Sequence, residues 1–142
     1  MTCVFCSIID GRLASSAVHE DAVSLAFMDL SPVTPGHTLV VPKLHYENLM
    51  DLPEIIGSHL WTVAHRIGQA LHRSSLSCEG VSITMASGAA AGQEVFHAHT
   101  HVFPRYPGDS YRVHAEWARP GRTELDSAAE QVRAALTTGP AD

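Results

Sequence analysis

A run in which every second residue is histidine restricts how this chain can fold, because side chains on a β-strand alternate between two faces. The run spans residues 97–101 and reads His-Ala-His-Thr-His. On a strand its three imidazoles share one face and lie roughly 6.5 to 7 Å apart along the chain. The opposite face is predicted to pack in the core and carries Phe96, Ala98, Thr100 and Val102.

Three polar rings in a row are costly to bury without partners, so the histidine face needs a chemical explanation. Spacing alone leaves two interpretations equally open. Alternate histidines on a strand can share one metal ion. They can also form a catalytic row, in which one imidazole attacks and its neighbours orient it and move protons.

The rest of the chain alternates short β-like runs with turn residues and contains one long amphipathic helix. Apolar residues that recur every three or four positions predict this helix, with a start signal near Asp51 and a stripe made of Ile56, Leu60, Val63, Ile67 and Leu71. Strands are predicted within 17–30, 37–42, 80–85 and 96–103, the last ended by Pro104, with a helical turn at 3–10, a loop at 87–92 and a final helix over 123–136. Strands joined by short turns, with one or two helices, indicate an α+β layer in one domain.

Composition narrows the class of protein. The chain has 142 residues, 45% of them hydrophobic, which is enough to bury a core without disulfides. A net charge of -6 argues against binding a DNA or RNA polymer or an anionic membrane surface. No uncharged run is long enough to span a bilayer and the first residues do not resemble a signal peptide, so we expect a cytoplasmic protein.

Five blocks of sequence keep unbroken spacing from one to the next. They are the C-x-x-C block at 3–11, Ala-Phe-Met-Asp-Leu-Ser-Pro at 26–32, and the blocks at 35–49, 90–96 and 97–109. Together they resemble the histidine-triad (HIT) family of nucleotide hydrolases and transferases. The resemblance implies a HIT domain over 1–109, with a five-stranded antiparallel sheet, one long helix, short helices and a two-fold homodimer. We expect residues 110–142, which lie outside it, to form a C-terminal extension packed on or completing the same domain.

The resemblance also implies a reaction at the α-phosphorus of a nucleotide. His99 is the implied nucleophile, which forms a covalent nucleotidyl-histidine that water then opens. His101 is implied to protonate the leaving group, and His37 to support it. Taken without the resemblance, His37 is simply a turn residue that follows Gly36. His97 would hold His99 in place.

Nucleoside binding is implied at several positions of this sequence. Asp29 matches the acid that binds the ribose hydroxyls, and the apolar slot for the base consists of Phe5, Ile8, Phe27 and Leu30, residue types that are equally typical of a core. An acidic chain needs local donors for phosphate. The candidates are Gln93, the backbone of the loop at 88–92, Ser87 and Arg105; a plain hairpin loop and a solvated arginine are the simpler interpretations.

Cys3 and Cys6 form a C-x-x-C motif, which without an export signal favours a metal or redox role over a structural disulfide. Family members with this motif complete a zinc site with residues that correspond to His45 and His97. The resemblance therefore implies one structural zinc ion per chain, with four protein ligands and no open position. A redox dithiol and two cysteines at a frayed end are the alternatives.

The sequence departs from the family pattern at Ala86, where an asparagine helps to bind phosphate, and at Glu94, whose carboxylate would repel phosphate if it pointed inward. We expect a hydrolase or transferase of dinucleoside polyphosphates, adenosine phosphoramidates or aminoacyl-adenylates, and the Phe-Pro-Arg-Tyr that follows the triad slightly favours the first. One alternative is a purine-nucleotide binding module with little turnover, which would bind AMP without a covalent intermediate. Another is a metalloenzyme built on the triad, which a chelator would inactivate.

Overall fold

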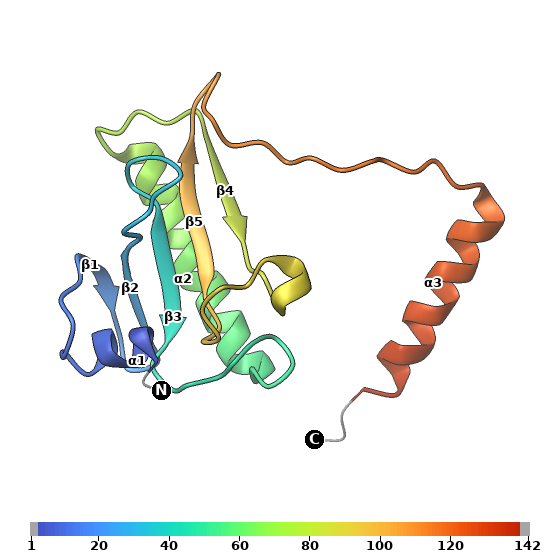
Figure 1. Cartoon of the computed structure of the whole chain (residues 1–142), viewed down its shortest axis with the longest axis horizontal. Coiled ribbons are helices and arrows are strands. Elements are labelled where there is room, and N and C mark those ends of the chain that lie inside the picture. Colours follow the sequence, from blue (N-terminus) through green and yellow to red (C-terminus); the bar gives the residue numbers. More distant parts are fainter. Residues whose placement is uncertain (1–2, 140–142) are drawn as a thin grey trace. The chain divides into compact units, whose positions relative to one another are not determined.

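The computed structural model describes residues 3–139 and divides the chain into two compact units, which meet between Tyr111 and Arg112. The first unit holds the sheet, two helices that cover one face of it each, and the histidine run (Figure 1). The second unit holds helix α3 (Arg122–Thr137), where the sequence predicts a helix over 123–136.

A single sheet of five antiparallel strands forms the frame of the first unit, in the order β1-β2-β3-β5-β4. The strands are β1 (Ala17–Glu20), β2 (Ser24–Met28), β3 (Thr38–Pro42), β4 (Gly80–Thr84) and β5 (Thr100–Arg105). This topology confirms the five-stranded antiparallel sheet and the α+β class that the sequence predicts. Because β3 and β5 are neighbours in the middle of the sheet, residues around 37 and 101 lie side by side.

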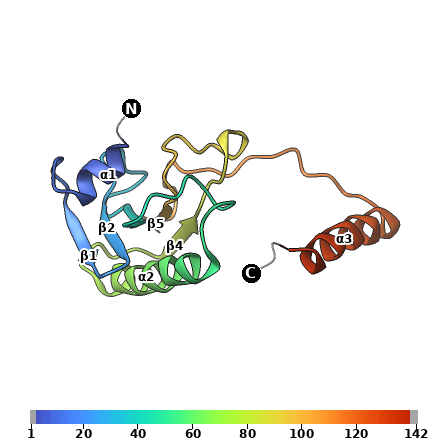
Figure 2. The ribbon, with the colours of Figure 1, turned by 90° about the horizontal axis from the view of Figure 1, so that it is seen from below.

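Two helices cover opposite faces of the sheet (Figure 2). The short helix α1 (Val4–Ile9) lies on one face, and the long helix α2 (Glu54–Arg73) lies on the other. A 3-10 turn, η1 (Ala89–Ala91), interrupts the loop that leads to the histidines. No helix within residues 3–139 is long and apolar enough to cross a membrane.

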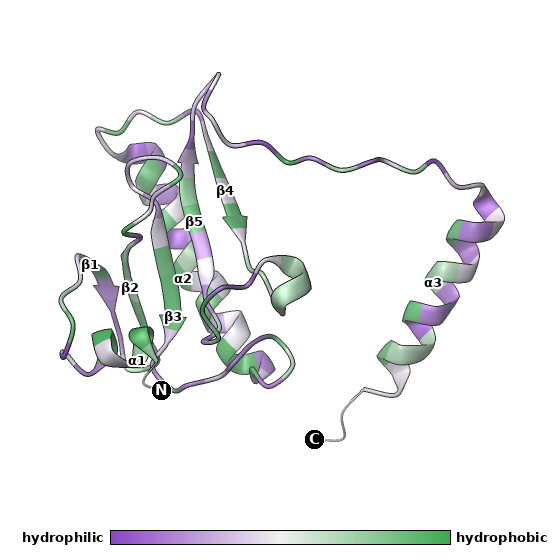
Figure 3. Cartoon of the chain, viewed as in Figure 1, coloured by the Kyte–Doolittle hydropathy of each residue, from purple (hydrophilic) through white to green (hydrophobic). Residues whose placement is uncertain are grey.

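The alternation of side chains on the central strands builds two separate cores. On β2, Leu25 and Phe27 point to the α1 face, while Ala26 between them points to the α2 face. When the ribbon is coloured by hydropathy, β3 is mostly green, while β5 also carries white and purple stretches (Figure 3). The α2 core contains the predicted helical stripe from Leu60 to Leu71. Burial on both faces therefore holds the sheet between the two helices.

Helix α2 begins three residues later than the start signal predicts. The carboxylate of Asp51 accepts the backbone N–H groups of Glu47 and Asn48, at 2.9 and 3.0 Å, and is therefore used by the preceding turn. The residue before the helix is Pro53, whose side chain offers no capping oxygen. A local capping motif predicted the existence of this helix but not its first residue.

Strand β5 also differs from its predicted limits. It begins at Thr100, after two of the three histidines, and continues through Pro104 to Arg105. The N–H of Ala98 donates to the carbonyl of Tyr46 at 2.7 Å instead of to a neighbouring strand. Phe96, which alternation predicts in the core, is 45% exposed. The triad therefore spans the junction between a loop and a strand.

Candidate functional site

A cavity of about 450 Å³ opens on the α1 face of the sheet, beside the histidine run. All eight predicted site residues that line it lie in three segments: α1, the β2–β3 region and the histidine run. The predicted residues in its wall are Phe5, Ile8, Phe27, Asp29, Leu30, His37, His99 and His101. Sequence reasoning missed other wall residues, among them Val4, Leu39 and Val95. Glu94, which was expected to point outward or to bind a cation, also lines the cavity. Leu39 was detectable in principle, because alternation along β3 puts it on the same face as Val41.

The hydrogen bond of His99 determines which of its ring nitrogens can react. Nδ1 lies 2.7 Å from the carbonyl oxygen of His97, and a carbonyl can only accept, so Nδ1 carries the proton. In the neutral ring, Nε2 is then left with a free lone pair. His99 is 7% exposed and lines the cavity. The ring edge of Phe5, 5.1 Å away between centroids, packs against it.

His37 and His101 form a directed pair. The backbone N–H of Val33 donates to Nδ1 of His37 at 3.0 Å, so the proton of the neutral ring lies on Nε2. This Nε2–H faces Nδ1 of His101 at 2.9 Å and donates to it. His101 therefore carries its own proton on Nε2. The chain of hydrogen bonds leaves an imidazole N–H on His101, whose ring centroid lies 4.9 Å from that of His99.

Burial keeps this pair neutral. Removal from water, together with the neighbouring rings of His99 and His37, lowers the pKa of His101 to about 4. Burial also lowers the pKa of His37, although the nearby carboxylate of Asp29 opposes that change. At neutral pH both rings are uncharged, which agrees with the direction of their hydrogen bonds.

Asp29 lies at the end of β2 with one oxygen used and the other turned toward the histidines. Its Oδ1 accepts the backbone N–H of Ser31 at 2.8 Å, which fixes the side chain. Its Oδ2 lies 3.5 Å from Nε2 of His37. The side chain is 20% exposed and lines the cavity, so a hydroxyl of a ligand can reach it.

Three predicted phosphate contacts have other partners. The buried amide of Gln93 donates to the carbonyls of Glu47 and Val95, at 2.6 and 3.0 Å, and accepts from the N–H of Gly88. It therefore holds the loop that precedes the triad. None of Gln93, Ser87 and Arg105 belongs to the cavity wall defined by residues 3–139.

The other two contacts also lie away from the ligand cavity. The Ser87 hydroxyl accepts the backbone N–H of Leu49 at 3.1 Å. Arg105 binds the carboxylate of Asp109 through two nitrogens, at 2.8 and 2.9 Å, and its hydrogen bonds hold the pKa of that carboxyl well below its usual range. Nη1 of Arg105 also donates to Ser82.

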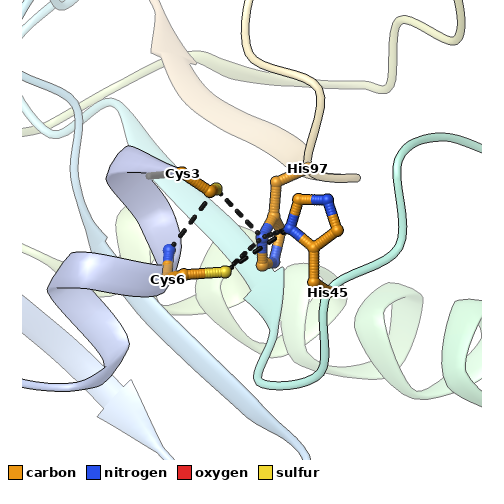
Figure 4. Close-up of side chains that lie close together, drawn as sticks. All are labelled: Cys3, Cys6, His45 and His97. Carbon is orange, nitrogen blue, oxygen red and sulfur yellow. Dashed lines mark hydrogen bonds between the residues drawn. The ribbon is translucent and has the colours of Figure 1, made fainter. Parts of the chain in front are cut away.

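Cys3, Cys6, His45 and His97 come together, in agreement with the ligand set that the family resemblance implies (Figure 4). The sulfur of Cys6 lies 3.4 Å from Nδ1 of His45 and 3.6 Å from Nδ1 of His97, and the two Nδ1 atoms are 3.2 Å apart. A zinc tetrahedron requires S–N edges of about 3.6 Å and N–N edges of about 3.3 Å, given the usual bond lengths. The four side chains therefore fit this ion.

The orientation of His97 supports the same conclusion. Its Nε2 lies 2.8 Å from the carbonyl of Pro42 and must donate to it, so Nδ1 keeps its lone pair and faces the two cysteines. Its ring is fully buried. A histidine of the triad thus points away from the cavity, which the simple alternation of a strand did not predict.

A second group, formed by Asp29, His37 and His101, also meets the distance criterion for a metal site. The hydrogen bonds argue against a metal there. Nε2 of His37 carries a proton because Nδ1 accepts from Val33, and a protonated nitrogen cannot ligate. This group is a hydrogen-bonded relay, and the geometry does not favour a metalloenzyme built on the triad.

His19 in β1 and His59 in α2 share a partner. Nε2 of each lies against Oδ2 of Asp21, at 2.9 and 2.8 Å respectively. The other oxygen of Asp21 accepts the backbone N–H groups of Val23 and Ser24. These contacts tie the β1–β2 turn to α2, far along the sheet from the cavity.

Comparison with known proteins identifies the class. Residues 11–108 match the HIT domain family, and the chain therefore belongs to this family of nucleotide-binding hydrolases and transferases. An uncharacterized HIT-like protein of Borreliella burgdorferi is 46% identical over 110 residues, which cover 77% of this chain and 79% of that protein. The adenylylsulfatase HINT3 of Arabidopsis thaliana is 34% identical over 130 residues, 92% of this chain and 65% of that protein. A Zn-bound histidine triad family protein from Mycobacterium smegmatis has a crystal structure that superimposes with a TM-score of 0.76, at 38% identity, covering 94% of this chain and 97% of that one.

Proposed function

We propose that this chain is a nucleotide hydrolase or transferase in which Nε2 of His99 attacks the α-phosphorus of a nucleoside 5′-phosphate derivative. The observation that carries the proposal is the hydrogen bond from Nδ1 of His99 to the carbonyl of His97, which leaves an unprotonated nitrogen in the cavity. A new N–P bond forms as the bond to the leaving group breaks, and the product is a nucleotidyl-histidine. The name of the Arabidopsis relative, an adenylylsulfatase, agrees with a reaction at an adenylyl phosphorus.

His101 and His37 handle the proton in this scheme. The N–H on Nε2 of His101 hydrogen-bonds the leaving-group atom. The negative charge of a bound phosphate favours uptake of a proton by the neutral pair, and this proton passes to the leaving group. Water then attacks phosphorus, the N–P bond breaks, and the pair takes the proton of the water. One water molecule is consumed in each cycle.

The cavity wall accommodates the nucleoside. The free Oδ2 of Asp29 accepts hydrogen bonds from the ribose hydroxyls. The base lies against apolar side chains, which bind it by contact area and discriminate weakly between bases. These side chains are Phe5, Ile8, Phe27, Leu30 and Leu39.

The charges of the wall favour an amine leaving group over a polyphosphate. Among the described residues no lysine or arginine lines the cavity, while two carboxylates, Asp29 and Glu94, do. Arg105, the predicted polyphosphate contact, is bound to Asp109. A polyphosphate would bring several negative charges to a wall without a cationic side chain. We therefore favour adenosine phosphoramidates and related compounds as substrates.

Quenching in alkaline denaturant, which preserves the acid-labile N–P bond, followed by intact-mass measurement tests the proposal. The full chain is mixed with adenosine phosphoramidate or diadenosine tetraphosphate and stopped within seconds. We expect one adenylyl group on the wild type and on His65→Ala, an exposed helix position, and none on His99→Ala. Faster consumption of the tetraphosphate would contradict the leaving-group preference. No adduct and no consumption over hours, together with measurable AMP binding, would instead favour the nucleotide-binding module.

We propose that Cys3, Cys6, His45 and His97 hold one structural zinc ion. The distances between the four side chains fit a closed tetrahedral site, and a zinc ion there would supply no catalytic position, since all four ligands come from the protein. Metal analysis of purified protein is expected to give one zinc per chain. Cys6→Ser should lose it, and Cys78→Ser, which changes a cysteine buried in the α2 core, should keep it.

We also propose a homodimer that uses the α2–β4 side of the sheet. Strand β4 is an edge of the sheet, and beside it lies an apolar groove of about 420 Å³ that includes Leu52, Ile83 and Met85. Trp61, at its rim, is 58% exposed. A second copy would cover both the groove and the unpaired strand edge. Analytical ultracentrifugation should give a dimer for the wild type and a monomer for Trp61→Glu.

A further inference from the structure

Helix α1 belongs to both sites of this chain. Cys3 precedes its first residue and Cys6 lies in its first turn, so two of the four metal ligands come from α1. Val4, Phe5 and Ile8, from the same helix, form part of the wall of the cavity proposed for the nucleotide. Helix α1 therefore contributes residues both to the metal cluster and to the cavity wall.

The side chain of Phe5 makes the contact between the two sites. It is 6% exposed, and its ring meets the rings of His97 and His99 edge to face, at centroid distances of 5.8 and 5.1 Å. It also contacts Phe27 in the cavity wall. His97 is a ligand of the metal cluster and His99 is the proposed nucleophile, so one ring packs on a residue from each site.

A second connection between the metal cluster and the cavity, besides the ring of Phe5, runs through the backbone. The carbonyl of His97 accepts the Nδ1 proton of His99 at 2.7 Å, so a shift of the metal ligand shifts the partner that holds the nucleophile. Both paths begin at the metal cluster and end at the wall or the nucleophile of the cavity.

Helix α1 is too short to be stable without these attachments. It has six residues, whereas isolated helices below about 12 residues are marginal in water. Its position depends on the contacts of the Cys3 and Cys6 sulfur atoms with His45 and His97 and on the apolar packing of Phe5 and Ile8. Loss of one attachment leaves the other to hold the helix alone.

We propose that metal binding and nucleotide binding are coupled through α1, so that metal at the cysteines orders the cavity wall and nucleotide in the cavity slows release of the metal. The inference rests on the proposed function, since it requires both ligands to bind. By linkage the coupling is reciprocal: the factor by which metal raises nucleotide affinity equals the factor by which nucleotide raises metal affinity.

Zinc release from the loaded full chain tests the coupling without any measurement of turnover. The protein is mixed with an excess of a chromogenic chelator, with and without saturating AMP, and the release rate is followed by absorbance. We expect AMP to slow release by about 5-fold or more, at the lower end of usual coupling energies. Calorimetry with AMP, on each zinc-loaded protein, establishes saturation beforehand.

Two variants of α1 locate the coupling. Phe5→Leu keeps an apolar side chain but removes the ring that meets both histidines, so the AMP effect on zinc release should be clearly smaller, with only the connection through the His97 carbonyl remaining. Ile9→Val changes the same helix at a partly buried position of the same core, outside the cavity wall, and should keep the full effect.

Each outcome decides between separate claims. Equal release rates with and without saturating AMP in the wild type refute the coupling, while the proposed zinc and nucleotide sites stand. An AMP effect as large in Phe5→Leu as in Ile9→Val refutes the route through α1. A chain that takes up no zinc, or binds no AMP, refutes the proposed function and the coupling with it.

Discussion

The loss of stability on acidification measures how strongly burial keeps His101 neutral. The pKa of this ring is lowered to about 4 in the folded chain, from 6.5, chiefly by burial. Between these two values the unfolded chain binds the proton and the folded chain does not, so the free energy of unfolding falls as the pH falls. The loss begins as the pH drops below 6.5 and stops growing below about 4.

The magnitude follows from the two pKa values. Linkage gives a penalty of roughly 0.2 kcal/mol at pH 7 and roughly 2 kcal/mol at pH 5 for this one side chain. Burial also lowers the pKa of His37 and of His97, so the whole protein is expected to lose more than this amount. A difference between variants is needed to isolate His101.

His101→Gln provides that difference. The glutamine oxygen can still accept the proton from Nε2 of His37, but the side chain no longer titrates. Urea unfolding at pH 7 and pH 5, followed by circular dichroism on zinc-loaded protein, should show a loss about 2 kcal/mol smaller in this variant than in the wild type. His65→Gln, at an exposed position of α2, should behave as the wild type does. Equal losses in wild type and His101→Gln would refute the argument.

Three further changes test the packing in urea or thermal unfolding. Gly36 has a φ of 100°, and an added Cβ would lie 2.6 Å from Cδ1 of Leu76, so Gly36→Ala should cost about 1 to 3 kcal/mol. Gly57 lies in α2 with its nearest neighbour at 3.6 Å, and Gly57→Ala should leave stability unchanged or raise it by about 0.5 to 1 kcal/mol. If both glycine variants change the free energy of unfolding by the same amount, the positive φ of Gly36 is not the cause of the loss. Leu60→Ala, at a fully buried core position, should cost about 2 to 5 kcal/mol; a cost under 1 kcal/mol would contradict the assigned core.

The sequence predicted elements where local periodicity and burial agree. The stripe from Leu60 to Leu71 has the 3.6-residue period of a helix, and the structure buries that stripe. The central strands were predicted because β-branched and apolar residues lie between prolines and glycines. The start of α2 was misplaced because Asp51 serves the preceding turn, a choice that depends on where Glu47 and Asn48 fold.

The residue types of the candidate site were predictable from the sequence, but their hydrogen-bond partners were not. The three histidines and the cysteine pair are visible as spacing. The donor that fixes His37 is a backbone N–H, at Val33, and a backbone group carries no signal in the sequence. Arg105 was assigned to a ligand because of its place after the triad, whereas its bond to Asp109 depends on the turn that follows β5.

The three histidines of the triad are chemically identical, and the structure makes them different through the partner of one nitrogen in each. His97 donates from Nε2 to a carbonyl, which turns the lone pair of Nδ1 toward the cysteines. His99 donates from Nδ1 to a carbonyl, which leaves Nε2 free in the cavity. His101 accepts at Nδ1 from another imidazole, which leaves a proton on Nε2. The three roles proposed for the triad, a metal ligand, a nucleophile and a proton donor, therefore fit one repeated residue type that has three different hydrogen-bond partners.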